Sequence, residues 1–352
     1  MFEAAGNIHM HTTYSDGTGS HQEIAEAAIA AGLDFVIVTD HNVWVNGVEG
    51  YYHNERGRVL LLVGEEVHDV RRQPQCNHCL VIGAEVGMSP HAQQPQALIE
   101  ATKKAGGYTF LAHPYDQPAA AIGERSYPWR DWDLEGFTGL ELWNYMSSIK
   151  EPMTNKLRAI QAAYRPEQLF NGPPAQTLAK WDELLTAGKQ VSVVGGSDGH
   201  AFQYEMGPLK RTIFPYEDMF RCVNTHVLLD EPLTGELAQD KPRILQAIGR
   251  GRGWVGYDLP HPTKGFRFSG QSLTKGIMGD KIKMDAGATL QVIAPAKCDM
   301  RIIHNGQVAA EAKNDISLTH LPLDLGAYRA ECRIQFEGQQ RGWIFSNPIY
   351  LV

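Results

Sequence analysis

At residues 9–16 the chain reads HMHTTYSD, directly after a short apolar β-type run. His9 and His11 stand two residues apart, so on a strand both side chains leave the same face and suit two ligands of one metal ion. Taken alone, a His-x-His pair is more typical of two hydrogen-bonded histidines inside a barrel. Further clusters of the same residue types downstream favour the metal-site interpretation.

Six short clusters of histidine and carboxylate residues lie along the chain, and each adjoins an apolar strand-like run. Their members are His9, His11, Asp16, His41, Glu66, His78, His113, Asp198 and His200. Active sites of α/β barrels assemble at the carboxyl ends of the strands, so we expect these side chains to meet at one mouth. Imidazole and carboxylate groups bind divalent transition metals. The sequence therefore predicts a multinuclear metal site and metal-assisted hydrolysis.

Bulk composition limits the alternatives. The 352 residues carry 32 basic and 40 acidic side chains, a net charge of −8, which argues against a broad surface for nucleic acid. No run of 18 apolar residues occurs, so we expect no membrane span. Five cysteines, with Cys76 and Cys79 around His78, are too few for a disulfide framework or a complete Cys-x-x-Cys zinc site. We expect a cytoplasmic protein, or a secreted or periplasmic one if a signal peptide was trimmed.

Residues 1–262 alternate apolar strand-like runs with helical patterns, which predicts an α/β domain. We expect strands near residues 7–10, 35–38, 59–63, 79–83, 108–111, 139–143 and 191–194, and helices near 22–31, 95–105, 153–164, 176–187 and 241–250. Ser20 and Glu23 have the spacing of a capping box at the first helix. Continuously apolar strands separated by helices indicate a parallel sheet covered on both faces.

Residues 263–352 have a different pattern, with short alternating strands and almost no helical periodicity. Asn305-Gly306 between two such runs predicts a tight hairpin, because both turn positions need a positive φ. We therefore expect a second, small all-β domain built as a sandwich. Its role is predicted to be structural, with dimerisation left open.

Four segments resemble the signature motifs of the PHP (polymerase and histidinol phosphatase) superfamily. They are residues 9–16, Thr39-Asp40-His41-Asn42, Ala112-His113-Pro114 and Ser197-Asp198-Gly199-His200. The resemblance covers roughly residues 7–260 and implies a distorted (β/α)7 barrel, here followed by an Ig-like sandwich. The chain is also similar to a two-domain subgroup of predicted phosphoesterases, near the carbaryl-hydrolase branch, whose substrates are carbamate or carboxyl esters.

The resemblance also implies two or three divalent metal ions, Zn, Mn or Fe, and a ligand set for each. By that pattern one ion is held by His9, His11, Glu66 and Asp198, a second by Glu66, His78 and His113, and a third by Asp16, His41 and His200. Glu66, Asp198, His200 and Asp16 are the expected catalytic residues. Only one of Glu65 and Glu66 is expected to face the barrel mouth, and Asp40 is a candidate for orienting a neighbouring histidine.

The leading hypothesis is a phosphoester hydrolase, for monoesters or diesters, that uses a metal-bound hydroxide on a small-molecule substrate. A metal-dependent carboxylester or carbamate hydrolase is the second hypothesis, and the third is a non-enzymatic binding protein, against which the complete ligand set argues. Arg125, Trp129 and Arg130 are expected to bind the substrate, unless they belong to a surface loop over buried tryptophans. Lys210 and Arg211 are second-rank anion-binding candidates, and the oligomeric state stays open.

Overall fold

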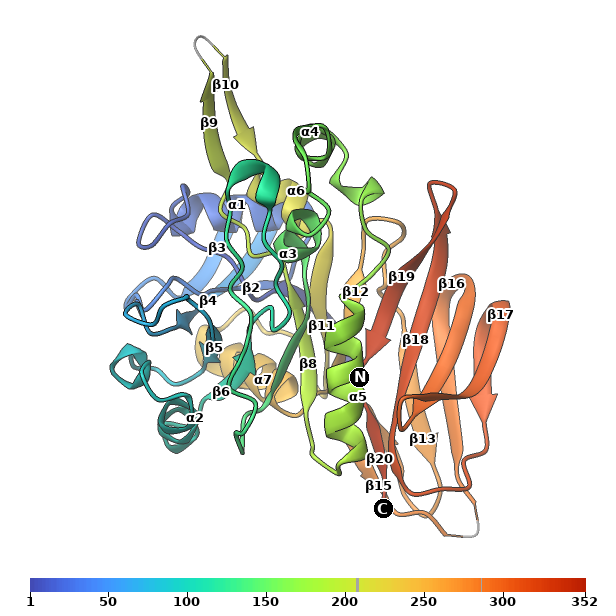
Figure 1. Ribbon diagram of the computed structural model, residues 1–352. Coiled ribbons are helices and arrows are strands. Elements are labelled where there is room, and N and C mark those ends of the chain that lie inside the picture. The colour runs from blue at the N-terminus through green and yellow to red at the C-terminus, as the bar shows by residue number, and fades with distance from the viewer. Residues whose placement is uncertain (207–208, 286) are drawn as a thin grey trace.

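The computed structural model describes residues 1–206, 209–285 and 287–352, and its N-terminal part is of mixed α/β class (Figure 1). The helices are α1 (His21–Ala31), α2 (Pro95–Lys104), α3 (Tyr145–Lys150), α4 (Lys156–Tyr164), α5 (Ala175–Thr186), α6 (Tyr216–Phe220) and α7 (Leu237–Gly249), with short 3₁₀ turns at Ser89–His91, Ala120–Ile122 and Pro166–Gln168. Ser20 and Glu23 form the predicted capping box at α1. Among these helices of the described ranges, none is long and apolar enough to span a membrane.

The strands of the N-terminal part pair in succession and close into a ring. They are β1 (Phe2–Asn7), β2 (Phe35–Val38), β4 (Gly57–Val67), β5 (Cys79–Ile82), β6 (Tyr108–Leu111), β7 (Gly139–Asn144) and β8 (Ser192–Gly196). A bridge between Met10 and Gly199 joins the segments that follow β1 and β8. The segments that follow these strands, and for β5 the segment that precedes it, are thereby gathered at one end of the ring.

The expectation of an all-parallel sheet is wrong at β5, which runs antiparallel to both β4 and β6. The connection from β4 to β5, residues 68–78, contains no helix. A parallel return would need a crossover long enough to traverse the sheet, whereas an antiparallel neighbour needs only a loop. The other neighbours in the ring, such as β1 and β2 or β7 and β8, pair in parallel.

Strand β1 begins and ends earlier than the sequence pattern predicted. It pairs antiparallel with β11 (Val223–Leu229) from Phe2 to Gly6. His9 and His11 follow it in an extended segment. Two backbone hydrogen bonds hold this segment: Asp198 N donates to His9 O at 2.8 Å, and His11 N donates to Gly199 O at 2.9 Å. The extended backbone preserves the alternation that places both imidazoles on the same side.

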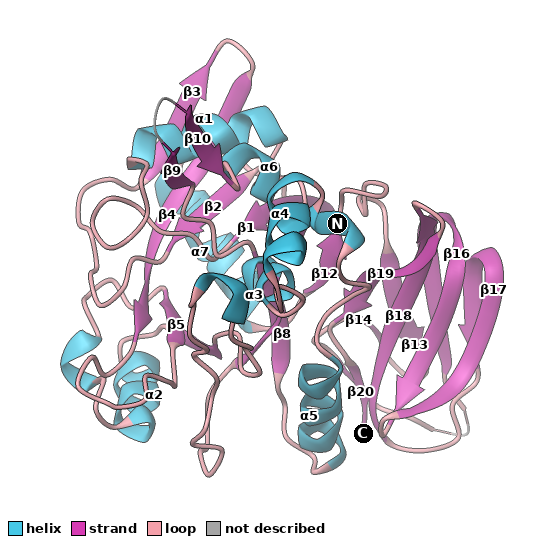
Figure 2. Cartoon of the chain, turned by 45° about the horizontal axis from the view of Figure 1, so that its top comes forward, coloured by secondary structure: helices cyan, strands magenta, loops and turns pink. Residues whose placement is uncertain are grey.

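Residues beyond 262 form an all-β region. Its strands are β13 (Arg267–Gln271), β14 (Lys275–Ile277), β15 (Lys281–Ile282), β16 (Thr289–His304), β17 (Gln307–His320), β18 (Gly326–Phe336), β19 (Gln339–Ser346) and β20 (Ile349–Leu351). Asn305 and Gly306 make the predicted hairpin turn between β16 and β17, with φ of 50° and 70°. Figure 2 shows β16–β19 side by side on one flank of the molecule, next to α5.

Backbone pairing continues between the two parts. Strand β12 (Gly253–Tyr257) pairs antiparallel with β11 on one side and with β19 on the other. Trp254 of β12 is fully buried in the same hydrophobic cluster as Phe266 and Trp343 of the C-terminal region. The predicted boundary at residues 262/263 lies in the loop between β12 and β13, while sheet and core continue from one part to the other, and it stays a prediction.

Three further strands complete the described chain: β3 (Gly50–Asn54), β9 (Phe202–Met206) and β10 (Leu209–Ile213). Strand β3 pairs with β4, whereas β9 and β10 pair only with each other among the described strands. They form a hairpin that begins just past the end of β8 and projects away from the remainder of the molecule (Figure 1).

Candidate metal centre

The carboxylate of Glu66 lies at the centre of the candidate site and is 1% exposed. Glu65, next to it on β4, points to the opposite face, where its Oε2 accepts a hydrogen bond from Met88 N at 2.6 Å. Five imidazoles place a ring nitrogen within 3.2 Å of Glu66, namely those of His9, His11, His41, His78 and His113. A buried carboxylate among imidazoles from separate strand ends has the setting of a ligand that bridges cations.

The first ligand group combines His9, His11, Glu66 and Asp198. The Nε2 atoms of His9 and His11 lie 3.1 and 3.2 Å from Glu66 Oε2, and 3.4 and 3.2 Å from Asp198 Oδ1. Four ligand atoms in a tetrahedron around an ion at about 2.0–2.1 Å lie about 3.3 Å apart. The spacing of these atoms therefore fits one tetrahedral cation.

The second ligand group uses the other oxygen of the same carboxylate. Glu66 Oε1 lies 2.8 Å from His78 Nδ1 and 2.9 Å from His113 Nε2. All three side chains are buried. Because one carboxylate faces two groups through its two oxygens, the geometry suits a pair of neighbouring cations.

The third group lies at the outer edge of the site. Asp16 Oδ1 is 3.4 Å from His200 Nε2, Asp16 Oδ2 is 3.5 Å from His41 Nε2, and His11 Nδ1 is also close, at 3.7 Å. Asp16 has 54% of its side chain exposed, against 14% for Asp198. This group is therefore the one most open to solvent.

Several ring nitrogens of the centre lack a hydrogen-bond partner within the described part of the chain. His11 Nε2, His41 Nδ1 and His78 Nε2 are buried and make no hydrogen bond of acceptable geometry, although carboxylate oxygens lie close to the first two. Buried polar atoms ordinarily have a partner, because losing water without replacement costs free energy. Divalent cations would supply partners to these imidazoles, so the donor set fits the metal that the sequence predicted.

Close backbone approach after β8 positions Asp198. A Cβ added at Gly196 would come 2.7 Å from the His9 Cβ, so only glycine lets the two segments lie this close. Asp198 has φ of +54° and His113 has φ of +28°. Non-glycine residues seldom adopt such angles, and they concentrate at functional sites, where the surrounding structure holds them in place.

Glu141 on β7 is a site residue that sequence reasoning missed. Its side chain is fully buried, and its Oε1 lies 2.9 Å from His9 Nδ1. Its Oε2 accepts hydrogen bonds from His113 N at 2.8 Å and from Asn144 Nδ2 at 3.0 Å. Glu141 thus fixes the ring orientation of His9, as carboxylates behind metal-binding histidines do. The sequence offered one signal for this role, a single acidic residue within an otherwise apolar strand.

Asp40 has a different task from the one expected. It accepts hydrogen bonds from Thr12 N at 2.8 Å, Thr12 Oγ1 at 2.6 Å and Ser15 Oγ at 2.6 Å. It therefore fixes the loop that carries Asp16. His68 stacks on His78, with centroids 4.2 Å apart, and belongs with His41 and His78 to a further group of close ligand atoms.

Opposing charges dominate the electrostatics of the centre. Burial disfavours ionisation, yet the nearby histidines, His9 foremost, hold the pKa of Glu66 and of Asp198 well below the usual values. Burial likewise opposes the charge on His9, but Glu141, Asp198 and Glu66 raise its pKa well above normal. Burial lowers the pKa of His78 to about 3. Ionised carboxylates and neutral imidazole bind cations directly, whereas His9 must release its proton when an ion binds.

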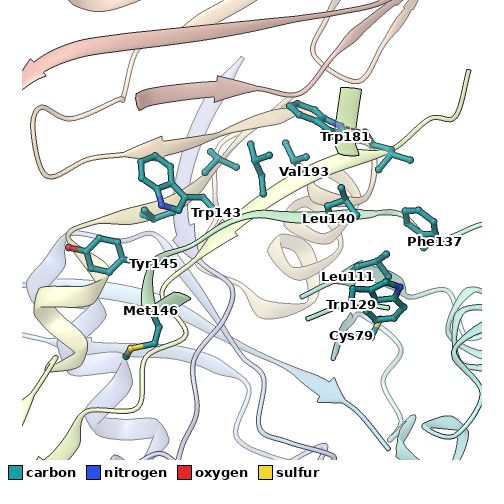
Figure 3. Packing of buried hydrophobic residues seen from close by; sticks show 14 of the residues in the cluster. Cys79, Leu111, Trp129, Phe137, Leu140, Trp143, Tyr145, Met146, Trp181 and Val193 are labelled. Carbon is teal, nitrogen blue, oxygen red and sulfur yellow. Dashed lines mark hydrogen bonds between the residues drawn. The ribbon is translucent and has the colours of Figure 1, made fainter. Parts of the chain in front are cut away.

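The expected substrate-binding role of Trp129 is wrong. Its ring is 3% exposed, lies in the same buried cluster as Cys79 and Leu111 (Figure 3), and donates from Nε1 to Asp131 O at 2.8 Å. Apolar partners from β5 and β6 draw the indole into the core. Arg125 and Arg130 are exposed.

Tyr127, which the sequence analysis did not single out, and Arg211, a second-rank candidate, lie in different surroundings. Tyr127 of the same insertion lies nearer the centre, with its ring 5.3 Å from that of His78 and its carbonyl 3.2 Å from His113 Nδ1. Arg211 is exposed and covers Tyr164, while the Lys210 side chain lies outside the described atoms.

A ring of strands with three His/carboxylate groups at one end defines an α/β protein with a candidate multinuclear metal centre. The family model of the PHP domain matches residues 7–117. That segment contains the motifs around His9, Asp40 and His113, together with Glu66 and His78. Placement near the carbaryl-hydrolase branch stays a prediction.

Two relatives and one solved structure are similar to the chain. An uncharacterized protein of Methanocaldococcus jannaschii is 28% identical over 163 residues, 43% of this chain and 90% of that protein. The DNA polymerase/3'-5' exonuclease PolX of Bacillus subtilis is 42% identical over 45 residues, 13% of this chain and only 8% of PolX. A two-domain protein of Bacteroides vulgatus containing a predicted PHP-like metal-dependent phosphoesterase is 16% identical with a TM-score of 0.41, covering 99% of this chain and 95% of that one. At that identity and TM-score, the structural likeness says nothing about function.

Proposed function

We propose that this protein is a metal-dependent hydrolase of phosphoesters, either monoesters or diesters. The observation that carries the proposal is the shared carboxylate of Glu66, whose two oxygens face two separate ligand groups. Hydrolases with adjacent cations use such a site to hold both the attacking and the leaving oxygen. We further propose that the ring of strands is a distorted (β/α)7 barrel and that the C-terminal strands form an Ig-like sandwich.

We propose three ligand sets, which the close spacing of the ligand atoms supports. His9, His11, Glu66 and Asp198 would hold one ion, Glu66, His78 and His113 a second, and Asp16, His41 and His200 a third. When bound, divalent Zn, Mn or Fe would make a coordinated water more acidic and offset negative charge on the phosphate oxygens. The third set is the most exposed, which supports an approach of the substrate from its side.

The chain's own residues prepare the site for this chemistry. Glu141 orients His9, and Asn144 Nδ2 donates to Glu141 Oε2 and, at 3.2 Å, to Asp198 Oδ2. These contacts fix the side chains of His9 and Asp198 before any substrate arrives, so these two side chains need no reorganisation during the reaction. We propose that one of Asp16, Asp198 and His200 transfers a proton to the leaving alcohol.

A plate assay on metal-stripped, Mn-reconstituted protein tests the proposal. It compares p-nitrophenyl phosphate, bis-p-nitrophenyl phosphate and p-nitrophenyl acetate. We expect metal-dependent release from a phosphate ester, and the preferred phosphate decides between monoester and diester. Release from the acetate alone would replace the proposal with the carboxylester or carbamate hydrolase, whose ligand set would be the same.

Variants test the assignment of the residues. His9→Ala, Glu66→Ala and Asp198→Ala are each expected to abolish turnover while the circular dichroism spectrum is retained. His53→Ala, at an exposed position of β3, serves as the histidine control and should leave turnover unchanged. Retained activity in any two of the three site variants would contradict the assignment.

A further inference from the structure

The hairpin of β9 and β10 continues directly from the candidate metal centre. His200 is followed by Ala201, with φ of +53°, and β9 begins at Phe202. The Phe202 ring stacks on the His200 imidazole, with centroids 5.0 Å apart and planes 8° from parallel. The base of the hairpin therefore touches a proposed ligand of the third ion.

One face of the hairpin carries aromatic rings and a cation. Phe202 and Tyr204 are two residues apart on β9, so their side chains share a face. Directly opposite residues of an antiparallel pair also share a face, and Arg211 of β10 stands opposite Tyr204. Gln203 lies on the reverse face, where its Oε1 accepts a hydrogen bond from Thr212 Oγ1 at 3.2 Å.

The ring-bearing face is turned toward α4. The Arg211 guanidinium lies 4.1 Å from the centroid of the Tyr164 ring at the end of α4, and it donates to Ala163 O at 3.3 Å. Phe202, Tyr204 and Tyr164 are nevertheless 43%, 56% and 64% exposed. Aromatic rings that lead outward from a candidate site without being buried in the fold are available to a ligand.

We propose that this face binds a planar ring in the alcohol part of the substrate, which makes the substrate class phosphoesters of ring-bearing alcohols. The inference rests on the proposed function. Hydrolysis breaks the bond between phosphorus and the alcohol oxygen; water supplies an oxygen to the phosphate and a proton to the alcohol. With the phosphate at the metal centre, the departing alcohol lies beside Phe202, and a planar ring stacks on Phe202 and Tyr204 next to the Arg211 cation.

A matched pair of substrates tests the inference. Benzyl phosphate and cyclohexylmethyl phosphate have leaving alcohols of similar size and acidity, but only the first has a planar ring. Their kcat/KM values are measured on the Mn-reconstituted full chain and on Tyr204→Ala, Phe202→Leu and Gln203→Ala. Metal content is measured for each protein, because Phe202 touches His200. Binding of benzylphosphonate and cyclohexylmethylphosphonate is measured by calorimetry as a readout independent of turnover.

We expect the unchanged chain to prefer the benzyl compounds. Tyr204→Ala and Phe202→Leu should lower kcat/KM for benzyl phosphate about three- to tenfold relative to cyclohexylmethyl phosphate, the range that stacking energies give. Gln203→Ala, on the reverse face of the same strand, should leave the ratio of the two kcat/KM values unchanged.

If the ratio of kcat/KM for benzyl phosphate to kcat/KM for cyclohexylmethyl phosphate is unaltered in both Tyr204→Ala and Phe202→Leu at full metal content, the inference is overturned and the proposed function stays intact. The opposite outcome is also possible to recognise. If no phosphoester is turned over, but the chain binds benzylphosphonate more tightly than cyclohexylmethylphosphonate and Tyr204→Ala removes that preference, the ring-binding face is sustained and the proposed function is rejected. Absence of both turnover and ring preference would reject both.

Discussion

Glu141 shows how one side chain behind the ligands governs the candidate centre. It contacts His9 through one oxygen and the His113 backbone through the other, and it is fully buried. Its negative charge is also a principal cause of the raised pKa of His9. Removing that charge without changing the shape isolates its contribution.

We predict that Glu141→Gln weakens metal binding about 10- to 100-fold, the usual cost of losing a carboxylate behind a ligating histidine. The affinity for Mn²⁺ or Zn²⁺ is measured by isothermal titration calorimetry. Glu65→Gln is the matched control, because Glu65 is a buried carboxylate that points away from the centre. Equal affinities in Glu141→Gln and the unchanged chain would show that Glu141 does not orient His9.

At the scale of elements, His226 joins three segments away from the metal centre. It lies on β11, with Nδ1 3.2 Å from Glu3 Oε1 on β1 and Nε2 2.9 Å from Asp258 Oδ2 just after β12. Burial alone would lower the pKa of His226, but Asp258 and Glu3 outweigh it and raise the pKa to about 9. The protonated imidazole therefore helps to hold the start of the chain against the connection to the C-terminal region.

We predict a pH-dependent loss of stability from this contact. The folded pKa of His226 exceeds the unfolded value of about 6.5, so its stabilisation is complete below about pH 6.5 and disappears as the pH rises through about 9. The difference corresponds to about 3 kcal/mol. Urea unfolding of the unchanged chain and of His226→Gln at pH 6 and pH 9.5 measures it. A free energy of unfolding that falls equally in both proteins would rule out His226 as the cause.

At the scale of the whole molecule, the two parts are joined by more than their connecting chain. Strand β12 pairs with β19, and Arg329 of β18 reaches across to α5. The Arg329 guanidinium is buried, bonds both oxygens of Asp182 at 2.7 and 2.8 Å, and lies over the Trp181 ring. Separating the two parts would expose apolar surface and leave a charged group without its partner.

We predict that the full chain unfolds in one cooperative transition and that Arg329→Met lowers the stability of both parts by about 3–5 kcal/mol, because it leaves carboxylates unpaired. Calorimetry and hydrogen exchange measured on each part check this. Arg301→Met serves as the control: its ion pair with Glu311 spans 3.8 Å between exposed side chains and should matter little. Two separate transitions, with only one shifted by Arg329→Met, would contradict the prediction.

The sequence by itself determined the features that arise from neighbouring residues. The alternation of His9 and His11, the capping box of Ser20 and Glu23 and the Asn305-Gly306 turn follow from the geometry of a few consecutive residues. The nine predicted ligand positions also lie at strand ends that the ring brings together. Their roles in binding metal stay a prediction.

Only the tertiary structure decided the features that depend on distant segments. Glu141 lies in an apolar strand, and only the position of β7, which brings its carboxylate behind His9, shows that it orients that imidazole. Trp129 is a core residue because β5 and β6 cover it, although its own loop reads as a surface loop. The antiparallel direction of β5 and the pairing of β12 with β19 likewise depend on which strands meet. Local patterns fix local geometry, whereas burial is set by contacts between residues far apart in the chain.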